Sequence, residues 1–358
     1  MNTLLIAFCT SCVLTFLLIR YQNLHGHISG DHDLSGPQKI HTQSVPRIGG
    51  AGIALGLLLG SIYIAIKDDA FNPIGFILLA CIPVFGIGLA EDLLKNIGVQ
   101  KRLFVTATGA LLAIFLVPVA ITSLDIVLLN WLLSFTVISV LFSCLAITGL
   151  ANAYNIIDGF HGLASMIAII TLGAILYIGF KQNDLLIFKL ALCMLAAIAG
   201  FFVWNYPRGL IFLGDGGAYL IGFWIAILSI MLVERNPAVS PWFAFTINIY
   251  PIFETLFSIY RRVIHQNKSP GQPDGIHFHT LIYRRVIRSN ALGQSQSDRN
   301  AKTAPYLWIL VVMNAIPSIL FFDSTLVLQG LTIVFILTYC FLYRSIVRFQ
   351  IPRWFHLY

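Results

Sequence analysis

Long apolar stretches separated by short polar segments run along the whole chain. Eleven of them are 17 or more residues long, which is the length that an α-helix needs to cross the hydrocarbon core of a bilayer. They lie at 3–19, 48–66, 74–90, 103–122, 131–151, 162–180, 185–204, 211–233, 241–260, 305–322 and 326–343. We therefore predict an all-α polytopic membrane protein with about eleven transmembrane helices, forming one domain over residues 1–358.

The composition agrees with this class of protein. Of 358 residues, 58% are hydrophobic and only 10% are charged, whereas a soluble domain carries about 25% charged residues. The opening Met-Asn-Thr lacks the basic segment of a cleaved signal peptide, so the first apolar run is expected to stay as a span. All six cysteines lie inside apolar runs without metal-ligand or disulfide spacing, which favours a packing role.

The basic residues are distributed unequally between the two sets of loops. Eighteen of the 22 lysines and arginines fall in one set together with the C-terminus, and only Lys67, Lys181, Lys189 and Arg235 fall in the other. By the positive-inside rule the first set is cytoplasmic, and an odd number of spans places the N-terminus outside. The net charge of +7 therefore indicates contact with anionic lipids or substrates, not with nucleic acid.

The longest of these cytoplasmic loops covers about residues 261–304. Within it Phe278, Ile282 and Val286 fall four residues apart, with Arg284 and Arg285 between them. This spacing predicts a short amphipathic helix lying among the lipid headgroups. A solvated lid without a function is the alternative.

The most informative motif is Asn152-Ala-Tyr-Asn155-Ile-Ile-Asp158 at the end of the fifth apolar run. Residues three apart share one side of a helix, so these two carboxamides and the carboxylate form one polar stripe at the membrane edge. Such a stripe suits a cation or a diphosphate. A helix cap formed by Asp158 before Gly159 is the competing explanation, although a cap needs only one such residue.

Two further acidic motifs lie in cytoplasmic loops. Asp215 is surrounded by glycines that let backbone and ligand approach closely, although a plain glycine-rich turn is the alternative. Glu91 and Asp92 are adjacent carboxylates that repel each other, and they require a cation, a shared proton or strong hydrogen bonds unless they are solvated. Lys101 and Arg102, in the same loop, are candidates for contact with substrate phosphates.

The first loop contributes Lys39 and Arg47, followed by Gly49 and Gly50 at the start of a span. A helix N-terminus offers N–H groups to an anion, so the segment is a candidate phosphate site. The alternative is that the glycines allow tight helix packing and that the cations only determine topology.

Glu254 and two histidines complete the unusual polar residues. A carboxylate such as Glu254 inside an apolar run is a functional candidate, with pairing to a cation or hydroxyl as the other explanation. His277 and His279 lack a third soft ligand for zinc, so phosphate recognition is the better use for them. Carboxylates beside phosphate-seeking cations predict Mg²⁺ as the cofactor, with Mn²⁺ as the alternative, and phosphoryl transfer as the chemistry.

In the order of these motifs along its sequence, the chain resembles the polyprenyl-phosphate N-acetylhexosamine-1-phosphate transferases, the superfamily that includes phospho-N-acetylmuramoyl-pentapeptide translocase. The resemblance covers about residues 39–288, with the motifs in family order. They are Pro46-Arg-x-Gly-Gly50, Glu91-Asp92, Asn152-x-x-Asn-x-x-Asp-Gly159, Phe212-x-Gly-Asp-x-Gly217, Pro251-x-x-Glu254 and Asp274-x-x-His-x-His279.

The resemblance implies transfer of a sugar-1-phosphate from a UDP-sugar to undecaprenyl phosphate on the cytoplasmic face of the bacterial inner membrane. UMP would be released, in the first step of a cell-surface glycan such as O-antigen. It implies that Asp215 holds Mg²⁺, that Glu91, Asp92 and Asp158 take part in catalysis, and that His277 and His279 contact substrate. A homodimer is a candidate assembly.

The chain departs from the family pattern at three positions. Glu91 stands where the family usually has Asp, Thr280 replaces the third histidine, and Gly275 replaces an arginine. The last two departures lie where the donor is expected, so the resemblance does not identify the sugar. A transporter and a noncatalytic lipid-binding protein remain the alternative functions.

Overall fold

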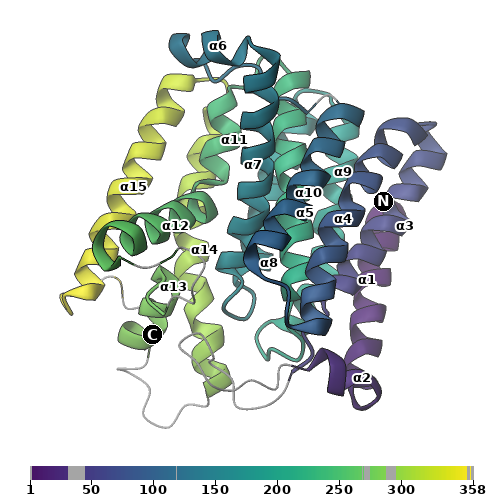
Figure 1. The fold of residues 1–358 in the computed structure, drawn as a ribbon, viewed down its shortest axis with the longest axis vertical. Helices are drawn as coiled ribbons and strands as arrows, with labels where there is room; N and C mark the ends of the chain where they lie inside the picture. The colour runs from purple at the N-terminus through teal and green to yellow at the C-terminus, as the bar shows by residue number, and fades with distance from the viewer. Residues whose placement is uncertain are drawn as a thin grey trace.

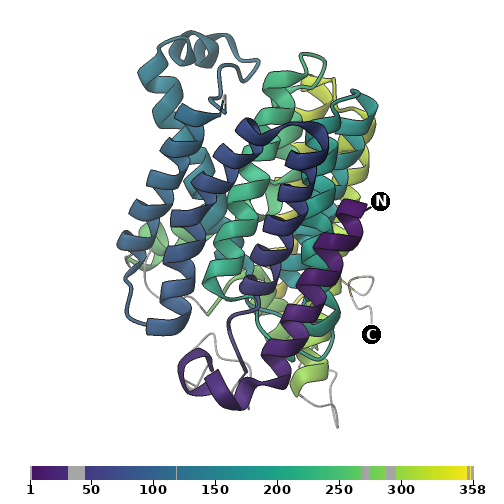
Figure 2. The same ribbon diagram turned by 90° about the vertical axis from the view of Figure 1, so that its right-hand side faces the viewer.

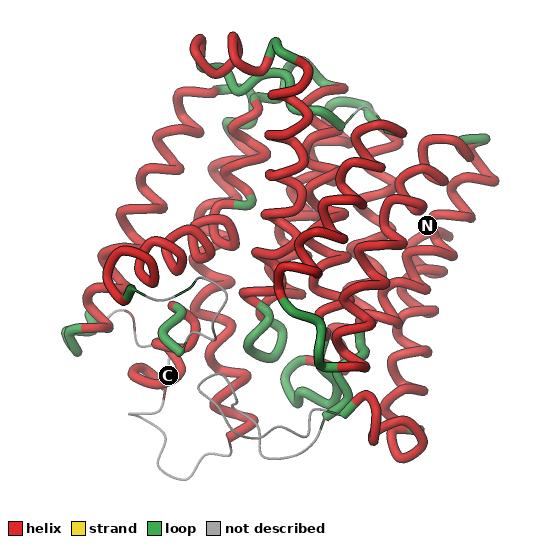
Figure 3. Tube along the Cα trace, in the orientation of Figure 1, coloured by secondary structure: helices red, strands yellow, loops and turns green. Residues whose placement is uncertain are grey.

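The computed structural model describes residues 2–30, 45–117, 119–267, 269, 275–287, 296–352 and 355, and over these residues the chain consists of helices joined by loops (Figure 3). The helices are α1 (Asn2–Arg20), α2 (Gln22–Ser29), α3 (Gly50–Asp68), α4 (Phe71–Leu94), α5 (Val99–Leu116), α6 (Val127–Leu133), α7 (Thr136–Ile157), α8 (Leu163–Lys181), α9 (Leu185–Asn205), α10 (Gly214–Arg235), α11 (Pro241–Ile247), α12 (Ile249–Tyr260), α13 (Phe278–Leu281), α14 (Gln296–Leu320) and α15 (Thr325–Val347). Two π-helical segments, Arg261–His265 and Ile282–Ile287, continue α12 and α13.

Within the described residues, ten helices are long and apolar enough to cross a membrane, and α11 with α12 forms a bent eleventh candidate. This confirms the predicted all-helical architecture, with ten to eleven candidate spans where the sequence predicts about eleven. Most of these helices run side by side between two ends of a bundle (Figures 1 and 2). We call the end that carries α2 and α13, at the bottom of Figure 1, the site end.

The ninth apolar run is not the straight span that the sequence predicts. Its two helices meet at Asn248 with an angle of 70°, so α12 lies across the bundle at a large angle to the long helices (Figure 1). The Asn248 side chain donates hydrogen bonds to the Ala244 carbonyl at 2.9 Å and to the Ser229 hydroxyl at 3.2 Å, which holds the break. Pro251, which has no N–H group, is accommodated in the first turn of α12.

Helix α10 forms the centre of the bundle and packs against α3, α4, α7 and α8. All its residues from Gly214 to Leu232 are buried. A helix that is apolar on every side belongs in the interior, and this one carries Asp215 at its first turn. The central helix therefore fixes the position of one candidate site residue.

Glycines let α3 and α4 approach the first turn of α10 at the site end. A Cβ atom added at Gly88 would lie 2.6 Å from the Gly216 Cα, and one added at Gly50 would lie 2.3 Å from the Gly217 backbone nitrogen. Real side chains do not approach backbone this closely. The packing alternative proposed for Gly50 is therefore what the structure shows.

We expect Gly88→Ala to lower the thermal stability of the detergent-solubilised protein, because the added methyl group meets backbone that cannot move aside. Overpacking of this kind costs about 1–3 kcal/mol. Gly86→Ala is the matched control, since nothing lies within 4 Å of a Cβ at that position of the same helix. Equal melting temperatures for the two variants would contradict the close contact between α4 and α10.

Polar contacts join the loops at the opposite end of the bundle. Asp184 accepts a hydrogen bond from the Ile187 backbone at the start of α9 and pairs with Arg235 Nε at 2.7 Å. Glu234 accepts hydrogen bonds from the backbone and hydroxyl of Thr122, both at 3.1 Å. The polar residues of these loops thus connect the helices to one another.

The segment expected to lie among lipid headgroups is helical, but its apolar residues face the protein. Phe278, Ile282 and Val286 are fully buried, whereas Arg284 is exposed. The segment packs against α14 and α15. The apolar side of this segment is therefore used for packing within the protein.

Candidate active site

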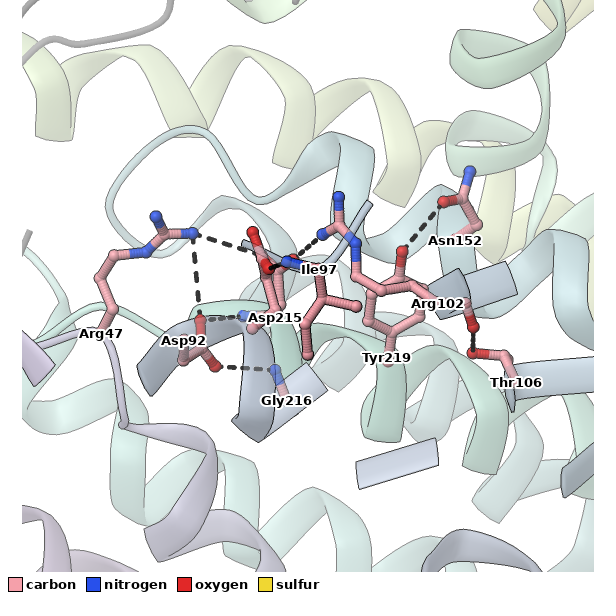
Figure 4. A network of polar contacts seen from close by, with 10 residues as sticks. Arg47, Asp92, Ile97, Arg102, Thr106, Asn152, Asp215, Gly216 and Tyr219 are labelled. Carbon is pink, nitrogen blue, oxygen red and sulfur yellow. Dashed lines mark hydrogen bonds and ion pairs between the residues drawn. The ribbon is translucent and has the colours of Figure 1, made fainter. Parts of the chain in front are cut away.

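The structure brings together polar side chains from five segments that are far apart in the sequence. Arg47 precedes α3, Asp92 lies near the end of α4, Arg102 in the first turns of α5, Asp158 directly after α7, and Asp215 in the first turn of α10. All of them lie at the site end of the bundle. Figure 4 shows the part of this cluster that lies around Asp215.

Asp92 holds the N-terminus of α10. Its two carboxylate oxygens accept hydrogen bonds from the backbone N–H groups of Asp215, at 2.8 Å, and Gly216, at 2.9 Å. Gly214, with φ of +76°, makes this approach possible, because a Cβ there would meet both the Arg47 carbonyl and the Asp92 carboxylate. The Asp92 side chain is almost fully buried and acts on the backbone that carries Asp215.

This contact predicts a particular effect of Asp92→Asn. An asparagine has one acceptor oxygen, and its amide nitrogen would face a backbone N–H that then lacks a partner. An unsatisfied buried group costs about 1–3 kcal/mol, so we expect lower thermal stability together with lower activity. If melting temperature were unchanged while kcat fell, Asp92 would act on substrate instead of on α10. Both quantities are measured on the same purified sample.

Asp215 lies between two guanidinium groups (Figure 4). Arg47 Nη2 donates to its Oδ1 at 3.3 Å, and Arg102 Nη1 donates to its Oδ2. The Asp215 side chain is 9% exposed, and those of Arg47 and Arg102 are 29% and 14% exposed. A buried carboxylate thus holds two partly exposed cations at the surface of the site.

Of the two adjacent cations expected to contact substrate phosphates, Arg102 is the one that the structure places in the cluster. Lys101 is exposed on α5, whereas Arg102 points to Asp215. The available signal was only the adjacency of two cations before an apolar run. Because α5 begins at Val99, its first turns decide which of the two faces the site.

The predicted polar stripe of α7 is present. Asn152 Oδ1 accepts a hydrogen bond from the Tyr219 hydroxyl of α10 at 3.2 Å, and Asn155 is partly buried. The helix ends at Ile157, so Asp158 occupies its C-cap position. Tyr219 was not predicted, because an aromatic residue in an apolar run carries no signal of its own.

The Asp158 carboxylate receives no hydrogen bond from the residues that the structure describes. The N-cap position of the next helix, α8, is occupied by Gly162 and not by Asp158. The helix-cap explanation for Asp158 is therefore not supported. Burial, together with the negative charge of Asp215, raises the pKa of Asp158 to about 7, although Arg47 acts in the opposite direction. Its protonation state is thus poised near neutral pH.

Two buried asparagines hold the turn that follows Asp158. Asn300 Oδ1 accepts a hydrogen bond from the His161 backbone at 2.8 Å, and Asn205 Oδ1 accepts one from the Gly162 backbone at 2.7 Å. These contacts tie the turn to α14 and α9. Neither asparagine was identified from the sequence.

Glu91 does not share a contact with Asp92. Its Oε2 accepts a hydrogen bond from the Ile97 backbone at 2.7 Å, which orders the turn between α4 and α5. The adjacent acidic pair is thus accommodated because each carboxylate accepts hydrogen bonds from a different backbone segment. Only Asp158, of the three predicted catalytic carboxylates, is not used in this way.

Among the described residues of the first loop, Arg47 belongs to the site. Arg47 reaches Asp215, whereas Lys39 lies outside the described residues. The Gly49 and Gly50 N–H groups donate to the Phe212 and Leu213 carbonyls, at 3.0 and 2.8 Å. The expectation that these two N–H groups bind a phosphate is therefore wrong, because backbone carbonyls already accept from them.

The two histidines lie together close to the Asp158 turn. The rings of His277 and His279 stack with their centroids 5.1 Å apart, and a Cβ added at Gly159 would lie 3.2 Å from His279 Nε2. Both histidines are buried. His277 Nδ1 lies 2.9 Å from Glu254 Oε1, which joins the candidate residue of α12 to this group.

Among the described residues, no group of three or more acidic, histidine or cysteine side chains is placed to hold a metal ion on its own. Mg²⁺ is usually held by one or two carboxylates together with substrate phosphates and water. The hard oxygen donors of Asp215 and Asp158, beside cations that attract phosphate, fit this type of site. Soft ligands such as cysteine are absent from the cluster.

Comparisons with known proteins agree with this arrangement. Residues 74–233 match the family model described as glycosyl transferase family 4. A relative from Bacillus subtilis, named probable undecaprenyl-phosphate N-acetylglucosaminyl 1-phosphate transferase, is 30% identical over 268 residues, which cover 70% of this chain and 69% of that protein.

A Thermotoga maritima protein named undecaprenyl-phosphate alpha-N-acetylglucosaminyl 1-phosphate transferase is 28% identical over 249 residues, which cover 70% of this chain and 72% of that protein. A Lactobacillus acidophilus phospho-N-acetylmuramoyl-pentapeptide-transferase is 28% identical over 264 residues, covering 70% and 80% of the two chains. Extended similarity at these levels, together with the family match, shows that the chain belongs to glycosyl transferase family 4.

Proposed function

We propose that this protein transfers an N-acetylhexosamine-1-phosphate from a UDP-sugar to undecaprenyl phosphate and releases UMP. The observation that carries the proposal is the buried Asp215 between Arg47 and Arg102 at one end of an apolar helix bundle. Relatives of the chain are named for this transfer to undecaprenyl or decaprenyl phosphate. The product would begin a cell-surface glycan such as O-antigen.

The proposal places the site end on the cytoplasmic side of a bacterial inner membrane and the N-terminus outside. Its support is the distribution of charge, since the segments at the site end carry most of the 22 basic residues. UDP-sugars are cytoplasmic metabolites in this scheme, so the donor would reach the site directly. The polyprenyl chain of the acceptor would remain in the bilayer.

Arg47 and Arg102 would bind the diphosphate of the donor. Their guanidinium groups form planar, paired hydrogen bonds with phosphate oxygens as well as with carboxylates. In the structure both pair with Asp215 and stay partly exposed, so they are already directed toward the site. Asp215 thus positions the two cations before the substrate arrives.

Mg²⁺, held by Asp215 with Asp158, would neutralise charge on the diphosphate and on the departing UMP. The acceptor phosphate has a second pKa of about 6, so it is mostly dianionic at neutral pH and needs little help from a base. Its oxygen would attack the phosphorus next to the sugar in line with the leaving UMP. Asp158 would orient the acceptor, with removal of a proton as a secondary role.

A transporter would place ionisable residues along a path through the middle of the bundle. The acidic and basic residues of the candidate site instead gather at one end, and Glu254, the acid within the bent span, is fully buried against His277 and Tyr339. This distribution favours chemistry at the membrane surface.

The proposal is tested with purified protein, undecaprenyl phosphate, Mg²⁺ and a panel of UDP-N-acetylhexosamines, with UMP release as the readout. We expect UMP release that depends on both the acceptor and one or more of these donors. No release with any donor, from protein that unfolds cooperatively on heating, would favour the noncatalytic lipid-binding alternative.

A further inference from the structure

Glu254 is buried completely and yet its carboxylate has three hydrogen-bond donors. His277 Nδ1 at 2.9 Å and the Phe278 backbone at 3.1 Å donate to Oε1, and the Tyr339 hydroxyl at 2.8 Å donates to Oε2. These donors come from two separate parts of the chain, the start of α13 and the middle of α15. The carboxylate therefore fixes the start of α13 to the membrane helices.

The contact also determines how the His277 ring is oriented. A carboxylate only accepts hydrogen bonds, so the proton of this contact is on His277 Nδ1. The ring stacks on His279 with an angle of 14° between planes. His279 in turn lies against Gly159, next to Asp158. A line of contacts thus runs from the buried Glu254 to the edge of the proposed active site.

Helix α15 provides a second support for the same segment. Tyr343, one turn beyond Tyr339, donates from its hydroxyl to the Ile276 carbonyl at 3.1 Å and accepts from Arg261 Nη1 at 2.8 Å. The chain entering His277 is therefore held on both sides of the histidine.

We propose that Glu254 is a positioning residue, which acts through His277 to set the two stacked imidazoles against the Asp158 turn, where they bind the phosphate groups of the donor. This inference rests on the proposed function, because it assigns the histidines to the UDP-sugar. Glu254 itself has no exposed surface through which it could contact substrate. Its effect on the site depends on its hydrogen bond with the ring of His277.

The test compares four variants in steady-state assays that vary donor and acceptor separately. Glu254→Gln keeps the shape but removes the charge and one acceptor, and we expect donor KM to rise about tenfold or more, by analogy with residues that orient a metal-bound histidine. The acceptor KM should stay within about twofold. Glu254→Gln combined with His277→Ala should equal His277→Ala alone, because the two residues act as one unit. Thr255→Val, one residue along α12, is the matched control and should leave both KM values unchanged.

Three outcomes of these variant assays would overturn the inference. They are multiplicative effects of Glu254→Gln and His277→Ala, an equal rise in acceptor KM, and a loss of folded protein without a change in either KM. A readout independent of turnover is the rate at which diethyl pyrocarbonate modifies His277, followed by peptide mass spectrometry. We expect slow modification in the parent protein and faster modification in Glu254→Gln, and equal rates would overturn the inference. An inactive parent protein would contradict the proposed function alone, since the modification rates would still report on the contact.

Discussion

Asp215→Asn is expected to lower kcat by about 10²- to 10³-fold, the range found when one preorganised electrostatic group is removed from an active site. The substitution keeps the shape of the side chain and the two backbone hydrogen bonds that Asp92 accepts at the start of α10. It removes the charge that pairs with Arg47 and Arg102 and that would hold Mg²⁺. The protein should therefore insert and fold.

The matched control is Asp184→Asn, which also removes a carboxylate paired with an arginine, but at the opposite end of the bundle. That variant should lose thermal stability while keeping its kcat. Activity is measured by UMP release over a range of Mg²⁺ concentrations. Near-normal activity of Asp215→Asn throughout that range would show that Asp215 is not the metal ligand.

Asp158→Asn is expected to lower kcat strongly and, at the same time, to make the folded protein more stable above pH 7. The pKa of Asp158 rises on folding from 3.8 to about 7, so the folded state keeps its proton to higher pH than the unfolded state does. Ionisation therefore opposes folding increasingly between about pH 4 and pH 7, and the cost is constant above that range. An asparagine is never ionised and does not carry this cost.

Each unit of pKa shift corresponds to about 1.4 kcal/mol, so the full cost is at most about 4 kcal/mol. We expect a smaller gain, because Asp158 is partly exposed and solvent screens its charge. Thermal unfolding of the parent protein and Asp158→Asn, without Mg²⁺ at pH 4 and pH 8, measures this gain in stability. The two proteins should be equally stable at pH 4. Lower stability of the variant at pH 8 would show that the ionised Asp158 stabilises the folded state, and it would contradict the raised pKa.

The convergence of the candidate residues could be predicted because each motif lies at the end of an apolar run. An odd or even number of spans between two motifs decides whether they lie at the same end of a bundle. An even number of spans separates Asp92 from Asp158 and Asp158 from Asp215, so all three are expected at the same end. The structure places them together. The roles assigned to them remain predictions, since they depend on substrate and metal.

The particular partner of each side chain could not be predicted. Asp92 accepts from backbone groups 123 and 124 residues away, and nothing local to α4 indicates that its carboxylate meets the start of α10. Arg102 and Lys101 differ only in their direction around α5, which the sequence of the preceding loop does not determine. The same holds for Tyr219, whose single hydroxyl reaches Asn152.

The bend between α11 and α12 was hidden by composition. An apolar run that continues through Asn248 satisfies the hydropathy of a span whether the helix is straight or broken. Only the contacts of Asn248 with Ala244 and Ser229 reveal the break. Periodicity also predicted the helix that begins at Phe278 but not its surroundings, because an apolar side fits protein or lipid equally well.

Isotope exchange between UMP and the UDP-sugar tests direct transfer at this site most closely. One phosphoanhydride bond is broken and another is formed, so the reaction should be readily reversible. With radiolabelled UMP, Mg²⁺ and unlabelled donor, label should enter the UDP-sugar only when undecaprenyl phosphate is present. Label entering without the acceptor would indicate a covalent phosphosugar-enzyme intermediate, and the absence of label even with the acceptor would exclude a readily reversible transfer; either result contradicts the account.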